Sequence, residues 1–153
     1  MTVLVFFISL TGLGQQSERK QYTTIRITNP PVINGMLDDE SWKSGLWEGN
    51  FTQNQPYSER PESQKTEFKI LCDDDNLYVA IKAYDTCPDS IVNRLARRDQ
   101  QDGDLVGIII DSFHDLRTGF LFGVSSTGVK YDHTMTLARF LILFFLGNLK
   151  ILA

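Results

Sequence analysis

The chain has 153 residues, of which 42% are hydrophobic, and this is enough for one domain with its own core. Its 19 acidic residues outnumber its 15 lysines and arginines, so the formal net charge is -4 and a nucleic-acid partner is not expected. Two cysteines are too few for a disulfide scaffold or for a zinc site made of thiolates.

The start of the chain is typical of an export signal. An apolar run, VLVFFISLTGL, covers residues 3–13 and gives way to polar residues. The run has the length of the hydrophobic region of a signal peptide and is too short to span a bilayer. We expect residues 1–14 to be a signal peptide and the protein to be periplasmic, on the cell surface or extracellular. No basic residue precedes the run, so a misplaced start codon or a buried strand is the alternative.

Short strands separated by turns follow, with little helical periodicity. Residues 22–28 show the alternation of a strand and are rich in β-branched side chains. Two prolines end the run. Asn34 and Gly35 form a turn pair. Asp38 is placed to cap a short helix through Trp42, because its side-chain oxygen can accept hydrogen bonds from the free amides of a first turn.

The strongest local prediction is a β-hairpin over residues 66–83. Apolar residues alternate on both sides of the turn-forming tetrapeptide DDDN at residues 73–76. With this tetrapeptide as the loop, the apolar residues of both strands face one core, whereas a slip of one residue would divide them. The expected opposite pairs are Cys72 and Leu77, Ile70 and Val79, and Phe68 and Ile81.

The same register makes two further predictions. Glu67, Lys69 and Lys82 share the other face of the hairpin, which we expect to be wet. Cys87 lies about ten residues along the ladder from Cys72, or roughly 30 Å away, so both thiols are expected to be free.

Three more strands are expected. Residues 105–111 (LVGIIID) are apolar on both faces. This pattern predicts a central strand that is covered on both sides. Residues 119–124 pair with it across a loop at residues 112–118, and a further strand begins at Gly128. Because no long helix separates these elements, the sequence predicts an all-β, antiparallel β-sandwich.

The last residues differ in character from the strands before them. Residues 140–146 read FLILFFL, which lacks alternation and is too short for a membrane anchor. We treat residues 136–153 as an atypical apolar tail with two explanations. Either the reading frame is wrong near Leu137, or the tail is a buried strand or helix.

Three blocks of the sequence resemble the carbohydrate-binding modules of family 9. The run PVINGMLD at residues 31–38, with Trp42 shortly after, is similar to the PxIDGxxDxxW opening of that family. The hairpin LCDDDNLYVAIKAYD is similar to the second block. The third block is DLVGIIID, followed by His114, Gly119 and Phe122. The resemblance covers about residues 22–135.

Within that family, the motifs RRD at residues 97–99 and FHD at residues 113–115 resemble the form of the domain found at the N-terminus of larger secreted bacterial proteins. In those proteins a β-barrel-like region follows. The resemblance implies a jelly-roll-like sandwich whose last strands lie beyond this chain. It also implies carbohydrate binding and an association with polysaccharide breakdown. Gly35, Asp38 and Trp42 are its structural positions, with Trp42 in the core.

Six residues are the candidate ligand-binding set. Aromatic and basic side chains on a wet face suit the C–H faces and hydroxyls of a sugar, and the set is Trp47, Tyr78, Lys82, Tyr84, Arg97 and Arg98. Packing in the core is the alternative for Trp47. A solvated turn with an internal ion pair is the alternative for the two arginines.

The chain departs from the sugar-binding members of the family at three positions. Gln101 stands where those members have a tryptophan, and Gly107 and Gly123 stand where they have polar side chains. The alternative function is therefore a structural or interaction domain that packs on a downstream barrel. A glycoside hydrolase is the least favoured function, because nothing in the sequence pairs two carboxylates.

No cofactor, transmembrane helix or metal site is expected. Asp102, Asp104 and Asp111 leave calcium as the alternative, since hard cations bind several oxygens, but their spacing matches no EF-hand loop. The expected partner is a polysaccharide or an oligosaccharide.

Overall fold

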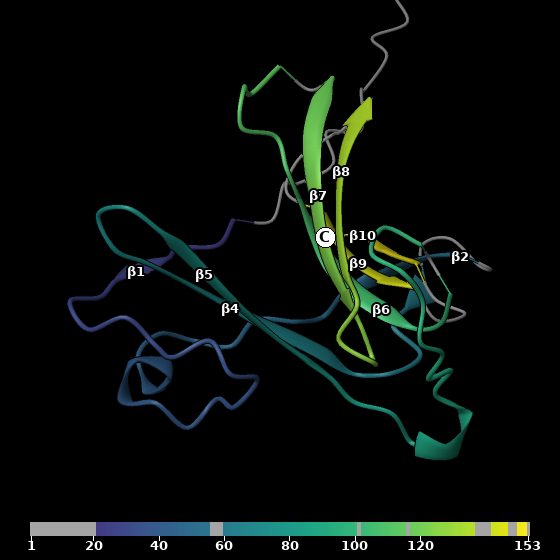
Figure 1. The fold of residues 1–153 in the computed structure, drawn as a ribbon. Coiled ribbons are helices and arrows are strands. Elements are labelled where there is room, and N and C mark those ends of the chain that lie inside the picture. The colour runs from purple at the N-terminus through teal and green to yellow at the C-terminus, as the bar shows by residue number, and fades with distance from the viewer. Residues whose placement is uncertain are drawn as a thin grey trace, which may run out of the picture.

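The structure, a computed structural model, describes residues 21–55, 60–100, 102–115, 117–136, 142–146 and 150–152. The predictions for the signal peptide and for Gln101 lie outside these ranges. The described chain is all-β, with three sheets and two short 3₁₀ helices, η1 (Glu40–Lys43) and η2 (Pro88–Ser90), so the predicted fold class is confirmed (Figure 1). None of its helices is long and apolar enough to cross a membrane.

The first sheet contains the predicted hairpin. Its order is β1 (Ile25–Arg26), β4 (Thr66–Cys72) and β5 (Leu77–Ala83). Strands β4 and β5 are antiparallel and pair Cys72 with Leu77, Ile70 with Val79, and Phe68 with Ile81, as the alternation predicts.

Strand β1 is shorter than the strand predicted over residues 22–28, and it runs parallel to β4. Hydrogen bonds from side chains hold the residues before β1 against β4, where a longer strand would use backbone hydrogen bonds. The hydroxyls of Tyr22 and Thr24 donate to the Ile70 carbonyl oxygen at 3.4 Å and 2.9 Å.

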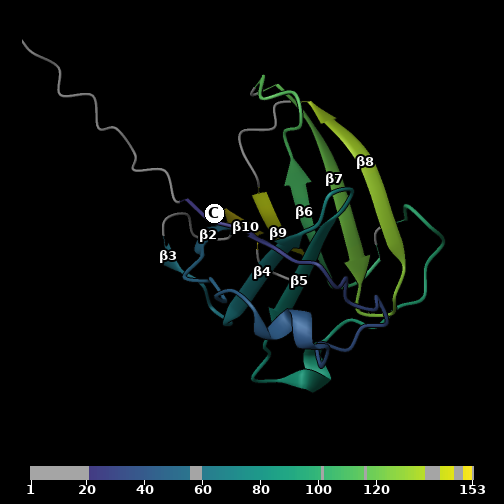
Figure 2. The same cartoon turned by 90° about the vertical axis from the view of Figure 1, so that its left-hand side faces the viewer.

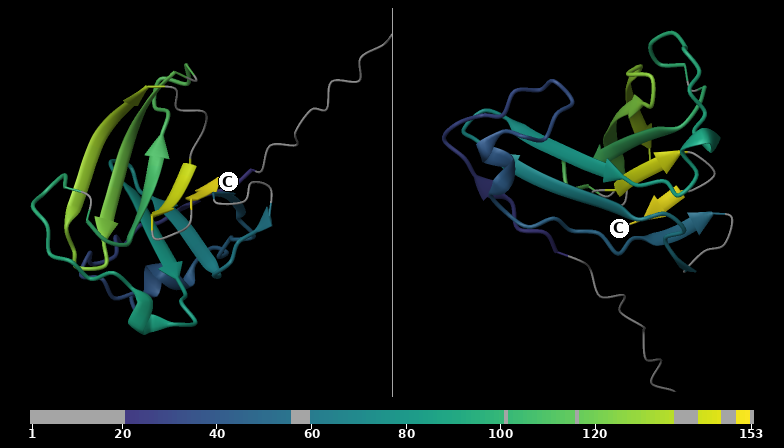
Figure 3. Two further views of the ribbon diagram at one scale, coloured as in Figure 1. Left: turned by 90° about the vertical axis from the view of Figure 1, so that its right-hand side faces the viewer. Right: turned by 90° about the horizontal axis from the view of Figure 1, so that it is seen from below.

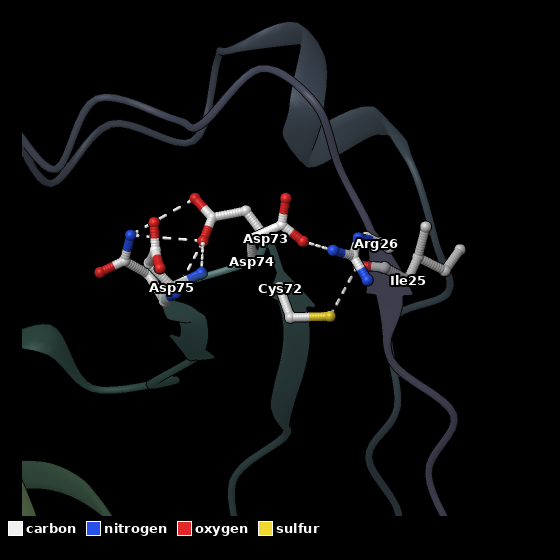
Figure 4. A network of polar contacts seen from close by, with 7 residues as sticks. Ile25, Arg26, Cys72, Asp73, Asp74 and Asp75 are labelled. Atoms are coloured by element: carbon white, nitrogen blue, oxygen red, sulfur yellow. Dashed lines mark hydrogen bonds and ion pairs between the residues drawn. The ribbon is translucent and has the colours of Figure 1, made fainter.

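The hairpin turn is fixed by its acidic residues (Figure 4). Asp73 Oδ1 accepts hydrogen bonds from the backbone amides of Asp75 at 2.9 Å and Asn76 at 2.6 Å. The Tyr78 hydroxyl donates to Asp73 Oδ2 at 2.6 Å and, with these amides, lowers the pKa of Asp73 to about 2. Arg26 of β1 forms an ion pair with Asp74, which ties the turn to the edge strand.

The second sheet contains the later strands in the order β8 (Lys130–Thr136), β7 (Thr118–Ser125), β6 (Leu105–Ile110) and β9 (Ile142–Leu146), all antiparallel. The prediction that β6 is central and covered is confirmed, because it lies between β7 and β9 and most of its residues are buried.

A third sheet joins β10 (Lys150–Leu152), β2 (Thr52–Gln55) and β3 (Arg60–Pro61). Residues 142–146 and 150–152 of the tail are thus strands. The frame error near Leu137 stays a prediction, and that residue lies outside the described ranges.

The main core lies between the hairpin and the second sheet, which Figures 2 and 3 show as two layers. Phe68 and Ile70 of β4 are buried with Phe51 and with Ile108 of β6, and Val79 is packed against them. The apolar face predicted for the hairpin is therefore the face that meets β6.

The opposite face of the hairpin, which we call the outer face, was expected to be wet, and this prediction is wrong for much of it. Leu71 is 0% exposed and Ala80 is 3% exposed, and both are packed with Ile27 and Trp42. The physical reason is that residues 27–47, which have almost no strand structure, cover this face and supply a second core.

The opening motif has the structural role that the resemblance implies, with one correction. Trp42 is 5% exposed in the second core, and Gly35 has φ 85°, a conformation that favours glycine. The short helix begins only at Glu40, its N-cap is Asp39, and no side chain caps it. Asp38 is exposed and Asp39 Oδ2 instead accepts from the Val32 amide at 3.3 Å, so the predicted cap at Asp38 is wrong.

Strand β7 carries an exposed apolar strip, which we call the β7 strip. Phe122 and Val124 are 49% and 41% exposed, and Phe113, in the loop before β7, is 69% exposed.

Candidate functional site

Four of the six predicted ligand-binding residues share the outer face of the hairpin. Tyr78 and Lys82 lie on one side of β5 because they are four residues apart in a strand. Tyr84 directly follows β5, and its hydroxyl donates to Glu67 on the same face of β4. Trp47 reaches this face because its neighbour Glu48 forms a two-way backbone bridge to Phe68, at 3.0 Å and 2.8 Å.

Trp47 is packed in the second core, which is the alternative given for it, and its ring also contacts two lysines. Its half-buried ring is packed, with Tyr78, against the second core. The same ring has two ammonium groups near it, with Lys82 Nζ 3.9 Å and Lys69 Nζ 4.9 Å from its centroid. Both distances are within the range of a cation–π interaction.

Lys69 is a buried cation. Its side chain is 2% exposed, and Nζ donates to the carbonyl oxygens of Trp42 at 2.8 Å and Gly45 at 3.0 Å. Burial, and secondarily the charge of Lys82, lower the pKa of Lys69. In the described chain, no carboxylate lies within 4.0 Å of the ammonium of Lys69 or Lys82.

A second group of polar atoms surrounds Glu67, which lies opposite Lys82 in the hairpin register. Lys65 Nζ is 2.6 Å from Glu67 Oε1, and the Tyr84 hydroxyl donates to Oε2 at 3.0 Å. The hydrogen bond from Lys65, followed by the one from Tyr84, lowers the pKa of Glu67. The Tyr84 ring is 45% exposed, and Lys65 Nζ lies 5.2 Å from its centroid.

These residues form one cluster, which we call the outer-face patch and in which the buried Lys69 lies beneath the surface: Trp47, Lys65, Glu67, Lys69, Lys82 and Tyr84. It offers an exposed aromatic ring, a carboxylate that accepts hydrogen bonds, and ammonium groups that donate them. The sequence reasoning left Lys65, Glu67 and Lys69 out of the ligand-binding set. The hairpin register already placed Glu67 and Lys69 beside Lys82 and could have identified them.

Arg97 and Arg98 are not part of this patch. Arg98 forms an ion pair with Asp132 of β8, and its Nε lies 3.6 Å from Asp99 Oδ2. Asp99 is itself bound to β8, because its amide donates to the Lys130 carbonyl at 3.2 Å. Arg98 thus holds a turn on the edge of the second sheet, which is the alternative given for it. Arg97 is exposed, and no contact in the described chain joins it to the patch.

The residues that left calcium as an alternative have other partners. Asp102 pairs with Arg94 at 3.2 Å, and Asp104 accepts from the Val92 amide at 3.2 Å. The described residues contain no group of three or more His, Cys, Asp or Glu side chains that could hold a metal ion. Calcium stays a prediction without a defined site. Cys72 and Cys87 are free, as the register predicts.

The two glycines that depart from the family pattern lie opposite each other in β6 and β7. A Cβ atom on Gly107 would lie 2.7 Å from the Phe122 carbonyl oxygen, and one on Gly123 would lie 3.2 Å from the Val106 carbonyl oxygen. The close approach of the two backbones therefore explains the glycine at position 107, and the tight spacing favours glycine at position 123.

A scan against protein-family models and searches of curated proteins and of solved structures found no match to this chain.

Proposed function

We propose that this protein is a non-catalytic, carbohydrate-binding domain of an exported protein, and that it binds a polysaccharide or an oligosaccharide on the outer-face patch. One observation carries the proposal. Trp47, Lys82 and Tyr84, chosen from the sequence as sugar-binding candidates, lie on one face of one hairpin, although Trp47 is more than thirty residues away from the other two. The resemblance of three sequence blocks to family 9 carbohydrate-binding modules supports the same function.

The chemistry of the patch suits a pyranose ring. The exposed face of Tyr84 can pack on the apolar C–H face of the sugar, while Glu67 accepts and Lys82 donates hydrogen bonds to hydroxyls. Lys65 and the Tyr84 hydroxyl already hold the Glu67 carboxylate in place. Because this side chain is ordered before binding, little of its conformational entropy is lost when a sugar binds.

The charge state of Glu67 favours binding over hydrolysis. A glycosidase needs a general acid with a raised pKa and a second carboxylate across the glycosidic bond. Lys65 and Tyr84 lower the pKa of Glu67, which favours the ionised form and opposes proton donation.

Affinity electrophoresis through gels that contain xylan, glucan or pectin tests the proposal. We expect at least one polysaccharide to retard the protein and the variant Tyr84→Ala to lose most of that retardation. Arg98→Ala is the matched control, because it removes an exposed side chain outside the patch. Unchanged mobility of a folded protein in every gel would overturn carbohydrate binding.

The β7 strip supports a second candidate, an interaction domain that packs on a downstream region of a longer protein. Exposed apolar groups that cluster on one strand are a feature of surfaces that bind another polypeptide, and Phe122 is 49% exposed on the strip. This candidate predicts that a photo-crosslinker at position 122 forms a covalent product with another polypeptide segment in exporting cells. It is abandoned if no such product forms while a polysaccharide retards the protein.

A further inference from the structure

We propose that the glycan bound by the outer-face patch is anionic, with a carboxylate or a sulfate group that pairs with Lys82. This inference rests on the proposed function and names the class of its ligand.

The patch has the opposite charge to the chain. The whole sequence carries a formal net charge of -4, whereas the patch contains three lysines and one glutamate, a formal charge of +2. Lys65 already neutralises Glu67, at a distance of 2.6 Å. Lys82, the register partner of Glu67, also attracts that carboxylate, though less than Lys65 does, so the excess positive charge belongs to the patch as a whole.

A ligand can reach the ammonium group of Lys82 but not that of Lys69. Lys69 is buried, and its ammonium donates to two backbone carbonyls, so its role is structural. Lys82 is only half-buried, and the contact recorded for its ammonium in the described chain is the Trp47 ring. An aromatic face attracts an ammonium but carries no net charge, and an ammonium has three hydrogens to donate. Lys82 can therefore offer N–H donors to a ligand.

An anionic group at Lys82 would improve the electrostatics of the patch. Lys69 and Lys82 lie near the same indole ring, and the charge of Lys82 lowers the pKa of Lys69, which means that the two ammonium groups repel each other. A carboxylate or sulfate would form a charge-assisted hydrogen bond with Lys82 and offset this repulsion, whereas a neutral hydroxyl would do neither.

Glu67 sets the orientation of the bound sugar. It lies opposite Lys82 on β4 and forms a hydrogen bond with Tyr84, so it repels an anionic group both beside the tyrosine ring and on its own side of Lys82. The anionic group is therefore expected at the Trp47 end of the patch, with the sugar ring on Tyr84.

Matched ligands test the inference. Isothermal titration calorimetry would compare oligogalacturonate with its methyl ester, which keeps the sugar and removes the charge, and sulfated dextran oligosaccharides with unsulfated ones. We expect an anionic ligand to bind about tenfold more tightly than its neutral counterpart, or about 1.4 kcal/mol. Preference for the carboxylate pair, the sulfate pair or both identifies the anion.

Variants assign the preference to Lys82. Lys82→Gln is expected to lose most of the tenfold preference, and Lys82→Arg, which keeps the charge, to retain it. Lys43→Gln, on the exposed short helix, is the control and should bind like the wild type. Thermal melting of each variant checks that it is folded.

Three results would overturn the inference in distinguishable ways. Equal affinity for charged and neutral ligands, lost in Tyr84→Ala, would overturn the anionic ligand and leave carbohydrate binding intact. An anionic preference that survives in folded Lys82→Gln would overturn the assignment to Lys82. Failure of the folded wild type to bind any of the glycans would overturn the inference and the proposed function together.

Discussion

Replacing Lys69 by methionine tests how the second core is held together. Methionine keeps the apolar stem in place but removes the ammonium that donates to Trp42 O at 2.8 Å and Gly45 O at 3.0 Å. These two bonds fasten the turn after the short helix η1 to the centre of β4. The variant therefore asks whether a buried cation without a carboxylate stabilises the fold or costs stability.

Three contributions determine how much Lys69→Met changes the free energy of unfolding. A hydrogen bond from a charged donor is worth about 1.5–3 kcal/mol, and this side chain makes two. The Trp47 contact adds about 0.5–2 kcal/mol. Removal of the charge recovers a desolvation cost of several kcal/mol for a side chain that is 2% exposed. The difference leaves a net loss of about 2 kcal/mol in the free energy of unfolding.

Urea unfolding followed by tryptophan fluorescence measures this difference, because Trp42 and Trp47 both lie beside Lys69. The variant should unfold at a lower urea concentration with an unchanged slope. Lys43→Met is the control, since the Lys43 side chain is 68% exposed and its midpoint should not move. A Lys69→Met variant as stable as the wild type, or more stable, would refute the reasoning.

The pH dependence tests a separate point, the cost of the Lys69 charge alone. Burial lowers the pKa of Lys69 below 10.5, so between the lowered value and pH 10.5 the unfolded chain binds more protons than the folded one. The stability of the wild type relative to Lys69→Met must therefore rise with pH in that interval. A gap that narrows as the pH rises would contradict the assigned direction.

Three further predictions concern the core, the turn and the β7 strip. Leu71→Ala, at a position that is 0% exposed, should lower the free energy of unfolding by about 2–5 kcal/mol in the same urea assay. Asp73→Asn should destabilise the protein at neutral pH. Because the pKa of Asp73 is about 2 in the folded chain and ordinarily 3.8, this contribution is complete above pH 3.8 and lost as the pH falls through about 2, so the two proteins should converge there. Phe122→Ser should leave the melting temperature unchanged in a thermal-melting assay, since Phe122 is 49% exposed on the β7 strip.

The register of the hairpin could be predicted because two independent signals agreed. The alternation of Phe68 and Ile70 gave the face, and the tetrapeptide at residues 73–76 gave the loop, so only one register satisfied both. The central position of β6 followed in the same way from a run that is apolar on both faces. Local pattern is sufficient where an element and its partner are close in sequence.

The covered outer face could not be predicted from the same pattern. Leu71 and Ala80 alternate with Lys69 and Lys82, so the face appears mixed, and nothing in its periodicity indicates a cover. Residues 27–47 cover this face. They show no regular periodicity because η1 is their only regular element, and apolar side chains of the segment pack against the hairpin. The pairing of β2 with β10 was missed for a related reason, since their partners are about a hundred residues apart.

In the candidate site, too, the residues close together in sequence could be placed and the distant ones could not. Lys82 and Tyr84 were placed correctly because the hairpin register fixes their face, whereas Trp47 was chosen by residue type alone. The pairing of Arg98 could not be predicted because its partner, Asp132, is 34 positions away on β8. A local cluster of charges does not show which of its members is already paired.

Lys69 links the stability of the fold to the geometry of the patch. By fixing the backbone at Trp42 and Gly45, it positions Trp47 two residues later, and the Trp47 ring in turn holds the Lys82 ammonium at 3.9 Å. Lys69→Met is therefore expected to weaken glycan binding even though Lys69 is too buried to contact a ligand. Lys82→Gln should weaken binding with a smaller fall in the unfolding midpoint than Lys69→Met, because it removes the contact with the Trp47 ring but none of the hydrogen bonds that Lys69 makes to Trp42 and Gly45. Measuring both quantities for both variants separates a residue that positions the site from one that contacts the ligand, which a binding measurement alone does not achieve.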